Sequence, residues 1–310
     1  MKSNSLSRRS LMQMSARLSA ASALAMSPIV RAAALAITSV PESAPPDHTV
    51  PALHVPESGA IPVAFLLSTN AVVIDFAGPW EVFREVQNRK TGQAAFKPYI
   101  VTETTAPVRV SGGMMIVPNF ALDNAPAPQV LVIPAQDGES PATLSWIREV
   151  TKHTDVTMSV CTGALLLAKT GLLDGRRATT HHSAYADLEV DYPKIHVDRG
   201  LRYVEDGNLA SSGGLSSGID LALHVVARYF GDDVARQTAF DMEYQGLGWK
   251  DPGLNAVYKQ AFVSTPGHPL CQVCGMEPDM KISTVYKGKT YYFCVAEHKR
   301  IFELAPEKFI

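Results

Sequence analysis

One of the four cysteines in this sequence has the surroundings of a nucleophile. Cys161 ends the apolar run 156–160 and is followed directly by Thr162, Gly163 and the helical pattern of residues 162–173. A cysteine on such a strand-to-helix turn faces unpaired N–H groups and the positive end of the helix dipole, which favour the thiolate that attacks electrophiles. The competing interpretation is a small apolar side chain that closes the end of a strand.

Asp75 is the acid that we expect to serve this cysteine. It follows the apolar run 61–68 by several residues and precedes Gly78 and Pro79, where we expect a helix to begin. A carboxyl group on that loop would face the same edge of the sheet as Cys161, where it could accept the thiol proton or donate one to a substrate. An ordinary acid at the approach to a helix is the alternative.

The other three cysteines lie in the C-terminal tail together with a histidine. Cys271 and Cys274 are separated by two residues, and Cys294 stands four residues before His298 on a predicted helix over 295–309. Three thiolates and an imidazole suit a tetrahedral site for zinc or another thiophilic metal. A disulfide between Cys271 and Cys274 is the alternative, because an exported chain meets an oxidising compartment.

The elements that must position Cys161 and Asp75 alternate between strands and helices. Apolar runs of strand length and amphipathic segments follow one another from residue 61, which predicts a mostly parallel sheet covered by helices on both faces. Ligands bind outside the carboxyl ends of such strands, here the loops 70–78, 135–140 and 161–163. A Ser/Gly-rich turn at 211–218 either caps the helix after it or presents N–H groups to an anion. The strands are expected at 61–68, 96–103, 114–119, 129–135 and 156–160, and the helices at 78–89, 143–153, 162–173, 183–192 and 218–230.

Three segments of this domain resemble the PfpI/ThiJ superfamily of class I amidotransferase-like proteins. They are LSTNAVVIDFAGPWEVF, MSVCTGALLLAKTGLLDGRRATTHHSA and LASSGGLSSGIDLALHVVARYFG, and the likeness is greatest to isonitrile hydratases and to the amidase-like domain of AraC-type regulators. The resemblance implies a flavodoxin-like three-layer α/β sandwich over residues 61–250. It also implies that Cys161 is the nucleophile, Asp75 its acid partner, Thr162 a hydroxyl neighbour and His181 a base or orienting group. A homodimer is expected by the same analogy.

The chain departs from this family at the expected oxyanion hole. Relatives usually carry a Gly-Gly pair where this sequence has Ala135 and Gln136, and residues other than glycine restrict the backbone there. We therefore expect the side-chain amide of Gln136, with the flexible backbone of Gly138 and Gly163, to contact the substrate or its oxyanion. Loss of catalysis at this site is the alternative.

The tail 268–310 resembles the YHS domain, a small metal-binding type of module. The resemblance rests on CGM, YKGKTYYFC and PEKF, with Cys274, Cys294 and His298 at ligand-type positions and Cys271 as an addition. It implies a small α+β module that holds a metal ion. Residues 251–267, which contain Pro266 and Gly267, are expected to link this module to the α/β domain.

The N-terminal segment has the composition of an export signal. Residues 1–36 begin with a basic stretch that contains Arg8 and Arg9, then turn Ala/Leu/Met-rich before the small residues 34–36. The pair of arginines resembles the twin-arginine motif, which predicts an exported or periplasmic protein that is not held in the membrane after cleavage. Residues 37–60 carry a proline every few positions and are expected to form an extended linker.

Composition excludes one class of partner. The formal net charge is −2, and no stripe of Lys and Arg recurs along the 310 residues, so we expect no nucleic-acid binding. The leading hypothesis is a cysteine-dependent hydratase, hydrolase or lyase that acts on a small isonitrile, amide or carbonyl compound and needs no organic cofactor. The second is a periplasmic metal- or redox-responsive sensor without turnover. The third is a regulator-like domain that lacks a DNA-binding part.

Overall fold

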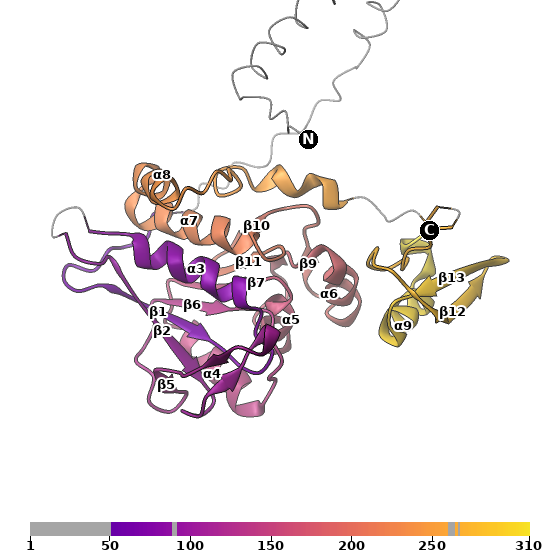
Figure 1. The fold of residues 1–310 in the computed structure, drawn as a ribbon, viewed down its shortest axis with the longest axis horizontal. Coiled ribbons are helices and arrows are strands. Elements are labelled where there is room, and N and C mark those ends of the chain that lie inside the picture. The colour runs from indigo at the N-terminus through magenta and orange to yellow at the C-terminus, as the bar shows by residue number, and fades with distance from the viewer. Residues whose placement is uncertain (1–50, 89–91, 260–263, 266) are drawn as a thin grey trace, which may run out of the picture. The chain divides into compact units, whose positions relative to one another are not determined.

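A seven-stranded sheet forms the centre of the computed structural model, which describes residues 51–88, 92–259, 264–265 and 267–310. The strand order is β10-β11-β7-β6-β1-β2-β5, and every neighbouring pair is parallel except β10 with β11 (Figure 1). The fold is thus the expected flavodoxin-like α/β arrangement. The strands are β1 (Ile61–Leu66), β2 (Phe96–Thr102), β5 (Phe120–Ala121), β6 (Val130–Ile133), β7 (Val156–Val160), β10 (Tyr203–Asp206) and β11 (Leu209–Ser212).

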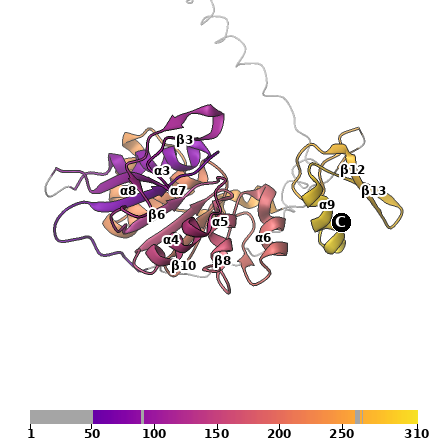
Figure 2. The same ribbon diagram turned by 90° about the horizontal axis from the view of Figure 1, so that it is seen from below.

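Helices cover both faces of this sheet, as the alternating pattern predicts (Figures 1 and 2). One face is buried under α3, α7 and α8, and the other under α4, α5 and α6. The central strands β1, β6 and β7 are buried along nearly their whole length, which explains their continuous apolar sequences. The helices are α3 (Val73–Glu85), α4 (Pro141–Thr151), α5 (Gly163–Lys169), α6 (Tyr185–Asp191), α7 (Ser217–Phe230) and α8 (Asp232–Asp241).

Helix α3 begins earlier than the sequence indicates. It starts at Val73, so Asp75 lies in its first turn and Pro79 lies inside the helix, whereas we expected Gly78 and Pro79 to begin it. Phe76, Pro79 and Val82 are all buried on one side of the helix, and this packing outweighs the backbone hydrogen bond that proline cannot donate. Asp75 is therefore held by a helix and not by a loop.

The expected strand at 114–119 is also wrong in large part. Only Met115–Ile116 form a strand, β4, which pairs with β3 (Val108–Arg109) in a small antiparallel hairpin outside the main sheet. Met115 and Val117 are exposed, so the apolar run reflects a solvent-facing hairpin and not a buried strand. Two further short elements, β8 (Arg177–Ala178) and β9 (His196–Val197), pair with each other.

The C-terminal module contains one β-hairpin and one helix. Strands β12 (Asp279–Tyr286) and β13 (Lys289–Phe293) are antiparallel, and α9 (Ala296–Leu304) and the 3-10 turn η4 (Pro306–Lys308) follow them. Lys287 and Gly288 both have positive φ, as a two-residue hairpin turn of this type requires. A cluster of buried side chains closes the module, among them Phe293, Ile301 and Phe302.

The expected linkers fall partly outside the described residues. Within 251–267, residues Pro252–Lys259 form the 3-10 helix η3, whose buried Asn255 accepts a hydrogen bond from Arg202. The expected export signal at 1–36 and most of the segment 37–60 lie outside the described residues. In the part of the chain that the structure describes, no helix has both the length and the apolar character needed to cross a membrane.

Candidate functional site

Cys161 occupies a strained turn between β7 and α5. Its φ is 59°, in the left-handed region that residues other than glycine seldom adopt, and such strain is typical of functional turns. The Cys161 N–H donates to the carbonyl of Gly213 at 3.1 Å, and the Thr180 hydroxyl donates to the Cys161 carbonyl at 2.9 Å. These bonds fix the backbone, so the direction of the Cys161 side chain is set by the sheet and its loops.

Gly163 allows helix α5 to approach the neighbouring strand. A Cβ atom at this position would lie 2.2 Å from the carbonyl oxygen of Ile133 and 2.7 Å from that of Pro134. Neither oxygen belongs to a flexible side chain, so only glycine fits without a shift of backbone. The structure thus gives Gly163 a packing role, and its contact with a substrate stays a prediction. Thr162 is the N-cap of α5, and its side chain makes no capping hydrogen bond.

Asp75 and Cys161 face each other in a buried site. Oδ2 of Asp75 accepts the N–H of Ala135 at 3.2 Å, and the carboxyl group also interacts with the thiol. Burial raises the pKa of Asp75 from 3.8 to about 6, against the opposing effects of the Ala135 N–H and the thiol. Burial, followed by the negative charge of Asp75, raises the pKa of the Cys161 thiol to about 12. The resting pair is therefore a thiol beside a carboxylate at neutral pH.

Two backbone N–H groups point at the sulfur atom of Cys161. They belong to Thr162 and Leu215, and both lower the pKa of the thiol. Leu215 has a φ of 42° and lies in the turn after β11. The sequence pattern indicated this turn only as a helix cap or a general anion site, and it did not identify Leu215. The available signal was the Gly213-Gly214 pair that precedes Leu215, but the sequence shows no partner for it.

His181 lies beside the same turn and not against the sulfur. Its Nδ1 accepts the N–H of Ser183 at 3.3 Å and lies 2.7 Å from the Ser183 hydroxyl, which leaves the proton of the neutral ring on Nε2. A Cβ atom added to Gly214 would lie 2.2 Å from the ring, so His181 packs directly on this glycine. No described contact joins the ring to Cys161. Burial, assisted by His182, lowers the pKa of His181 to about 4, so the ring is neutral at pH 7.

A small cavity of about 170 Å³ opens next to this turn. His181 and Leu215 line it. Because the N–H of Leu215 also bonds the Cys161 sulfur, the cavity lies next to that sulfur. His182 stacks on Tyr258 with ring centroids 4.7 Å apart. The cavity is lined by His181, His182, Arg202, Gly214, Leu215, Ser216, Ser217, Asn255 and Tyr258.

The loop after β6 makes contacts that differ from those of an oxyanion hole. The side chain of Gln136 accepts the N–H of Ser68 at 2.6 Å and donates to the carbonyl of Leu66 at 3.0 Å. The N–H of Ala135 donates to Asp75, and a Cβ atom at Gly138 would collide with the Ser68 hydroxyl at 2.5 Å. Gln136 therefore fastens this loop to the end of β1, while the N–H groups near the sulfur come from Thr162 and Leu215.

The three cysteines and the histidine of the tail converge. The ligand atoms of Cys271, Cys274, Cys294 and His298 all lie within 4.8 Å of one another. Sγ of Cys294 is 3.1 Å from Nδ1 of His298 and 3.4 Å from Sγ of Cys274. Tetrahedral zinc with Zn–S bonds of about 2.3 Å requires sulfurs roughly 3.8 Å apart, so this donor set fits zinc after small adjustments.

The electrostatics of this cluster also suit a metal. All four cysteines of the chain are free thiols. The Cys274 thiol donates to Cys271 and holds the pKa of the Cys271 thiol well below its ordinary value, against the effect of burial and with the help of His298. The same bond raises the pKa of the Cys274 thiol, so the pair shares a proton that a bound metal would displace. A thiolate is the form that binds metal ions.

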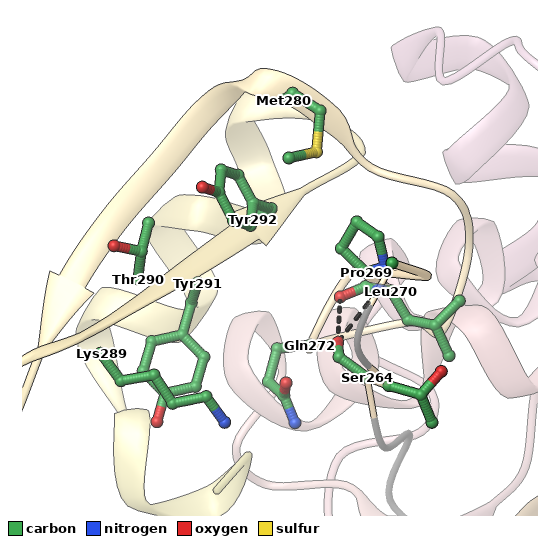
Figure 3. Close-up of a pocket in the computed structure, with 11 residues that line it drawn as sticks. Ser264, Pro269, Leu270, Gln272, Met280, Lys289, Thr290, Tyr291 and Tyr292 are labelled. Carbon is green, nitrogen blue, oxygen red and sulfur yellow. Dashed lines mark hydrogen bonds between the residues drawn. The ribbon is translucent and has the colours of Figure 1, made fainter.

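A larger hollow of about 470 Å³ lies elsewhere in the C-terminal module (Figure 3). Strand β13 contributes Lys289, Tyr291 and Tyr292, and the hydroxyl of Ser264 bonds both backbone groups of Leu270 at its edge. Its lining includes Ser264, Thr265 and Gly267, which are sequence neighbours of residues outside the described part of the chain, and we assign no site to it.

Comparisons with known proteins agree with this geometry. Residues 62–228 match the sequence model of the DJ-1/PfpI family. An isonitrile hydratase of Pseudomonas putida is 33% identical over 60% of this chain and 79% of its own length. The transcriptional regulator CdhR of Pseudomonas aeruginosa is 30% identical over 56% of this chain, which spans only 52% of that regulator.

Solved structures show the same fold. A ThiJ/PfpI family protein of Pseudomonas syringae superposes with a TM-score of 0.54 and 28% identity, over 67% of this chain and 84% of its own. The DJ-1beta protein of Drosophila melanogaster superposes with a TM-score of 0.52 and 20% identity, over 61% of this chain and all of its own. At this lower identity the second likeness concerns the fold alone.

Proposed function

The chain belongs to the DJ-1/PfpI family, and on that premise we propose that it is a cysteine-dependent enzyme acting on a small electrophile. Among isonitriles, amides and carbonyl compounds, we favour an isonitrile because the match with the isonitrile hydratase of Pseudomonas putida extends over 79% of that enzyme. The observation that carries the proposal is the buried contact between Asp75 and the Cys161 thiol on a strained turn. A carboxylate beside a thiol supplies both the base and the nucleophile.

In the proposed reaction the proton moves between sulfur, Asp75 and substrate. The Cys161 sulfur forms a bond to the electrophilic carbon while its proton passes to the Asp75 carboxylate. Asp75 then donates this proton to the substrate atom that receives the electron pair. With an isonitrile, water then adds across the resulting carbon–nitrogen double bond, its oxygen to the attacked carbon and one proton to nitrogen. The carbon–sulfur bond breaks as the carbonyl forms, and the second water proton returns the sulfur to a thiol. From an isonitrile the product is an N-substituted formamide, which contains the substrate plus one water.

The remaining residues have supporting roles in this proposal. The N–H groups of Thr162 and Leu215 would stabilise negative charge on the sulfur or on an oxygen bonded to the attacked carbon. His181 is neutral and carries its proton on Nε2, so it would act as a hydrogen-bond donor in the cavity and not as the base for Cys161. Gln136 would shape the site by holding its loop.

Turnover of simple alkyl isonitriles tests the proposal. The purified wild-type protein should convert them to formamides, measured by chromatography, and Asp75→Asn should lower the rate by roughly 10²–10⁴-fold. Asp137→Asn is the matched control, because Asp137 is an exposed acid at the same end of the sheet that bonds Asn70. Equal loss in both variants would show that Asp75 has no particular role.

We further propose that the C-terminal module binds one zinc or other thiophilic ion through Cys271, Cys274, Cys294 and His298. This cluster is also what supports the second candidate function, a metal- or redox-responsive sensor. Metal analysis of the purified protein should find one ion per chain, and Cys274→Ser should remove it. A wild-type protein with stoichiometric metal and no turnover of isonitriles, amides or carbonyl compounds would favour the sensor.

Export and dimerisation remain proposals. Residues 1–36 should be absent from protein recovered from the periplasm. The mass of the undigested protein, measured by mass spectrometry, would show this. Replacement of both Arg8 and Arg9 by lysine should retain the protein in the cytoplasm.

Light scattering should give twice the mass of the chain if the homodimer forms.

A further inference from the structure

We propose that Asp187 of helix α6 is the outer carboxylate of the metal centre and that metal binding thereby fastens the C-terminal module to the α/β domain. The inference rests on the proposed metal centre in the tail. It adds a residue that neither the spacing of the cysteines nor the likeness of the tail to a metal-binding module indicates, since Asp187 belongs to α6, far from the tail in the sequence.

The two nitrogens of His298 have different neighbours. Nδ1 lies 3.1 Å from Sγ of Cys294 and 3.5 Å from Sγ of Cys271, so it is the nitrogen that faces the metal position. Nε2 lies 3.5 Å from Oδ2 of Asp187. Both side chains of this pair are largely buried, with 11% and 17% of their surface exposed. A histidine that binds metal through one nitrogen commonly donates the other N–H to such a carboxylate.

Helix α6 packs against the module on both sides of Asp187. Ala186 is buried in the same apolar cluster as Cys271 and Phe293, and Val190 packs on that cluster. Asp191, one turn further along, pairs with Arg300 of α9 at 2.6 Å. Asp187 therefore lies within the packed contact between α6 and the C-terminal module.

A bound metal would strengthen this contact. A cation on Nδ1 withdraws electron density from the imidazole ring and makes the Nε2 proton a better donor to Asp187. In return, the carboxylate fixes the ring orientation and raises the basicity of the nitrogen that binds the metal. The two effects are coupled, so zinc should protect α6 and Asp187 should raise the affinity for zinc.

The test is the zinc affinity of the full-length protein, measured by competition with a coloured chelator. Asp187→Asn should weaken zinc binding about 10–100-fold. Asp191→Asn is the matched control, because it removes an acid of the same helix that contacts α9 through an exposed ion pair. We expect it to change the affinity by less than about twofold.

Three readouts distinguish a metal-orienting residue from one that merely stabilises the fold. The increase in melting temperature caused by zinc, measured from each protein's own zinc-free value, should be smaller in Asp187→Asn than in wild type. Cobalt bound to the variant should retain the absorption of a three-thiolate site. Zinc should slow amide exchange in residues 185–191 of the wild type and not of the variant.

The outcomes separate this inference from the metal centre on which it depends. A wild type that binds zinc, with an Asp187→Asn variant of equal affinity, would overturn the role of Asp187 and leave the metal centre in place. Equal weakening by Asp187→Asn and Asp191→Asn would also overturn it. A wild type that binds no zinc would overturn the metal centre itself and the inference with it.

Discussion

The two cysteine sites of this protein are assembled in opposite ways. Cys161 is a single thiol whose partners come from distant segments: Asp75 from α3, Thr162 from the turn, and Leu215 from the loop after β11. The four donors of the tail come from one short module and converge on each other. The first environment raises the pKa of its thiol, and the second lowers the pKa of Cys271.

The difference follows from what surrounds each sulfur. Cys161 is buried beside an acid, so its proton is retained until a substrate arrives and Asp75 accepts it. Cys271 lies among other donors, which stabilise a thiolate before any metal binds. The same side chain is therefore arranged for proton transfer at one site and for ligation at the other.

Removal of one thiol from each site in turn should give the largest effects. Cys161→Ala should lower isonitrile turnover by at least about 10³-fold, because the nucleophile is lost, and should leave the zinc content at one per chain. Cys274→Ser should remove the zinc, as metal analysis would show. Full turnover by Cys161→Ala, or loss of its zinc, would remove the distinction between the sites.

The packing beneath the Cys161 turn can be tested through stability. Gly163→Ala should lower the free energy of unfolding by about 3 kcal/mol or more, because the added methyl group meets two backbone carbonyls. Gly253→Ala is the control, since its nearest neighbour is the flexible carboxylate of Asp251 at 3.0 Å. Urea unfolding that shifts equally in both variants would contradict this close approach.

The buried carboxylate of Asp75 should lower the free energy of unfolding by an amount that depends on pH. Its pKa in the folded chain is about 6 and thus above the ordinary 3.8, so the stabilisation from its bound proton is complete below pH 3.8 and is lost as pH rises through 6. Asp75→Asn should therefore gain stability relative to wild type between pH 4 and pH 7, by at most about 3 kcal/mol. Urea unfolding at both pH values measures this. A difference that does not change with pH would contradict the buried charge.

The sequence predicted the sheet domain well because its signals are strong. Continuous apolar runs bounded by turn residues favour strands buried on both faces, and the turn at Cys161 is defined by residues adjacent to it. The start of α3 was misplaced because Pro79 resembles a first helical residue, while the burial of Phe76 that decides the matter depends on tertiary packing. The strand at 114–119 failed for the same reason, since exposure cannot be read from apolar residues alone.

The site was predicted unevenly. Cys161 and Asp75 could be paired because parallel strands place their following loops at one edge of the sheet. The contacts of Gln136 with Ser68 and Leu66, and the N–H of Leu215, depend on how loops distant in sequence fold together, so no local pattern indicates them. The tail needed only spacing, because its four donors lie close in sequence. The proposed partner Asp187 is the exception, since a contact between distant segments of the chain has no signal in spacing.

The pH dependence of kcat/KM for an alkyl isonitrile tests the central claim most directly. If Asp75 accepts the proton of Cys161, the wild-type value should rise about tenfold per pH unit below pH 6 and level off above it. In Asp75→Asn the value should be low and without this inflection. An inflection near pH 6 that persists in Asp75→Asn, or a wild-type profile that is flat through pH 6, would contradict the account.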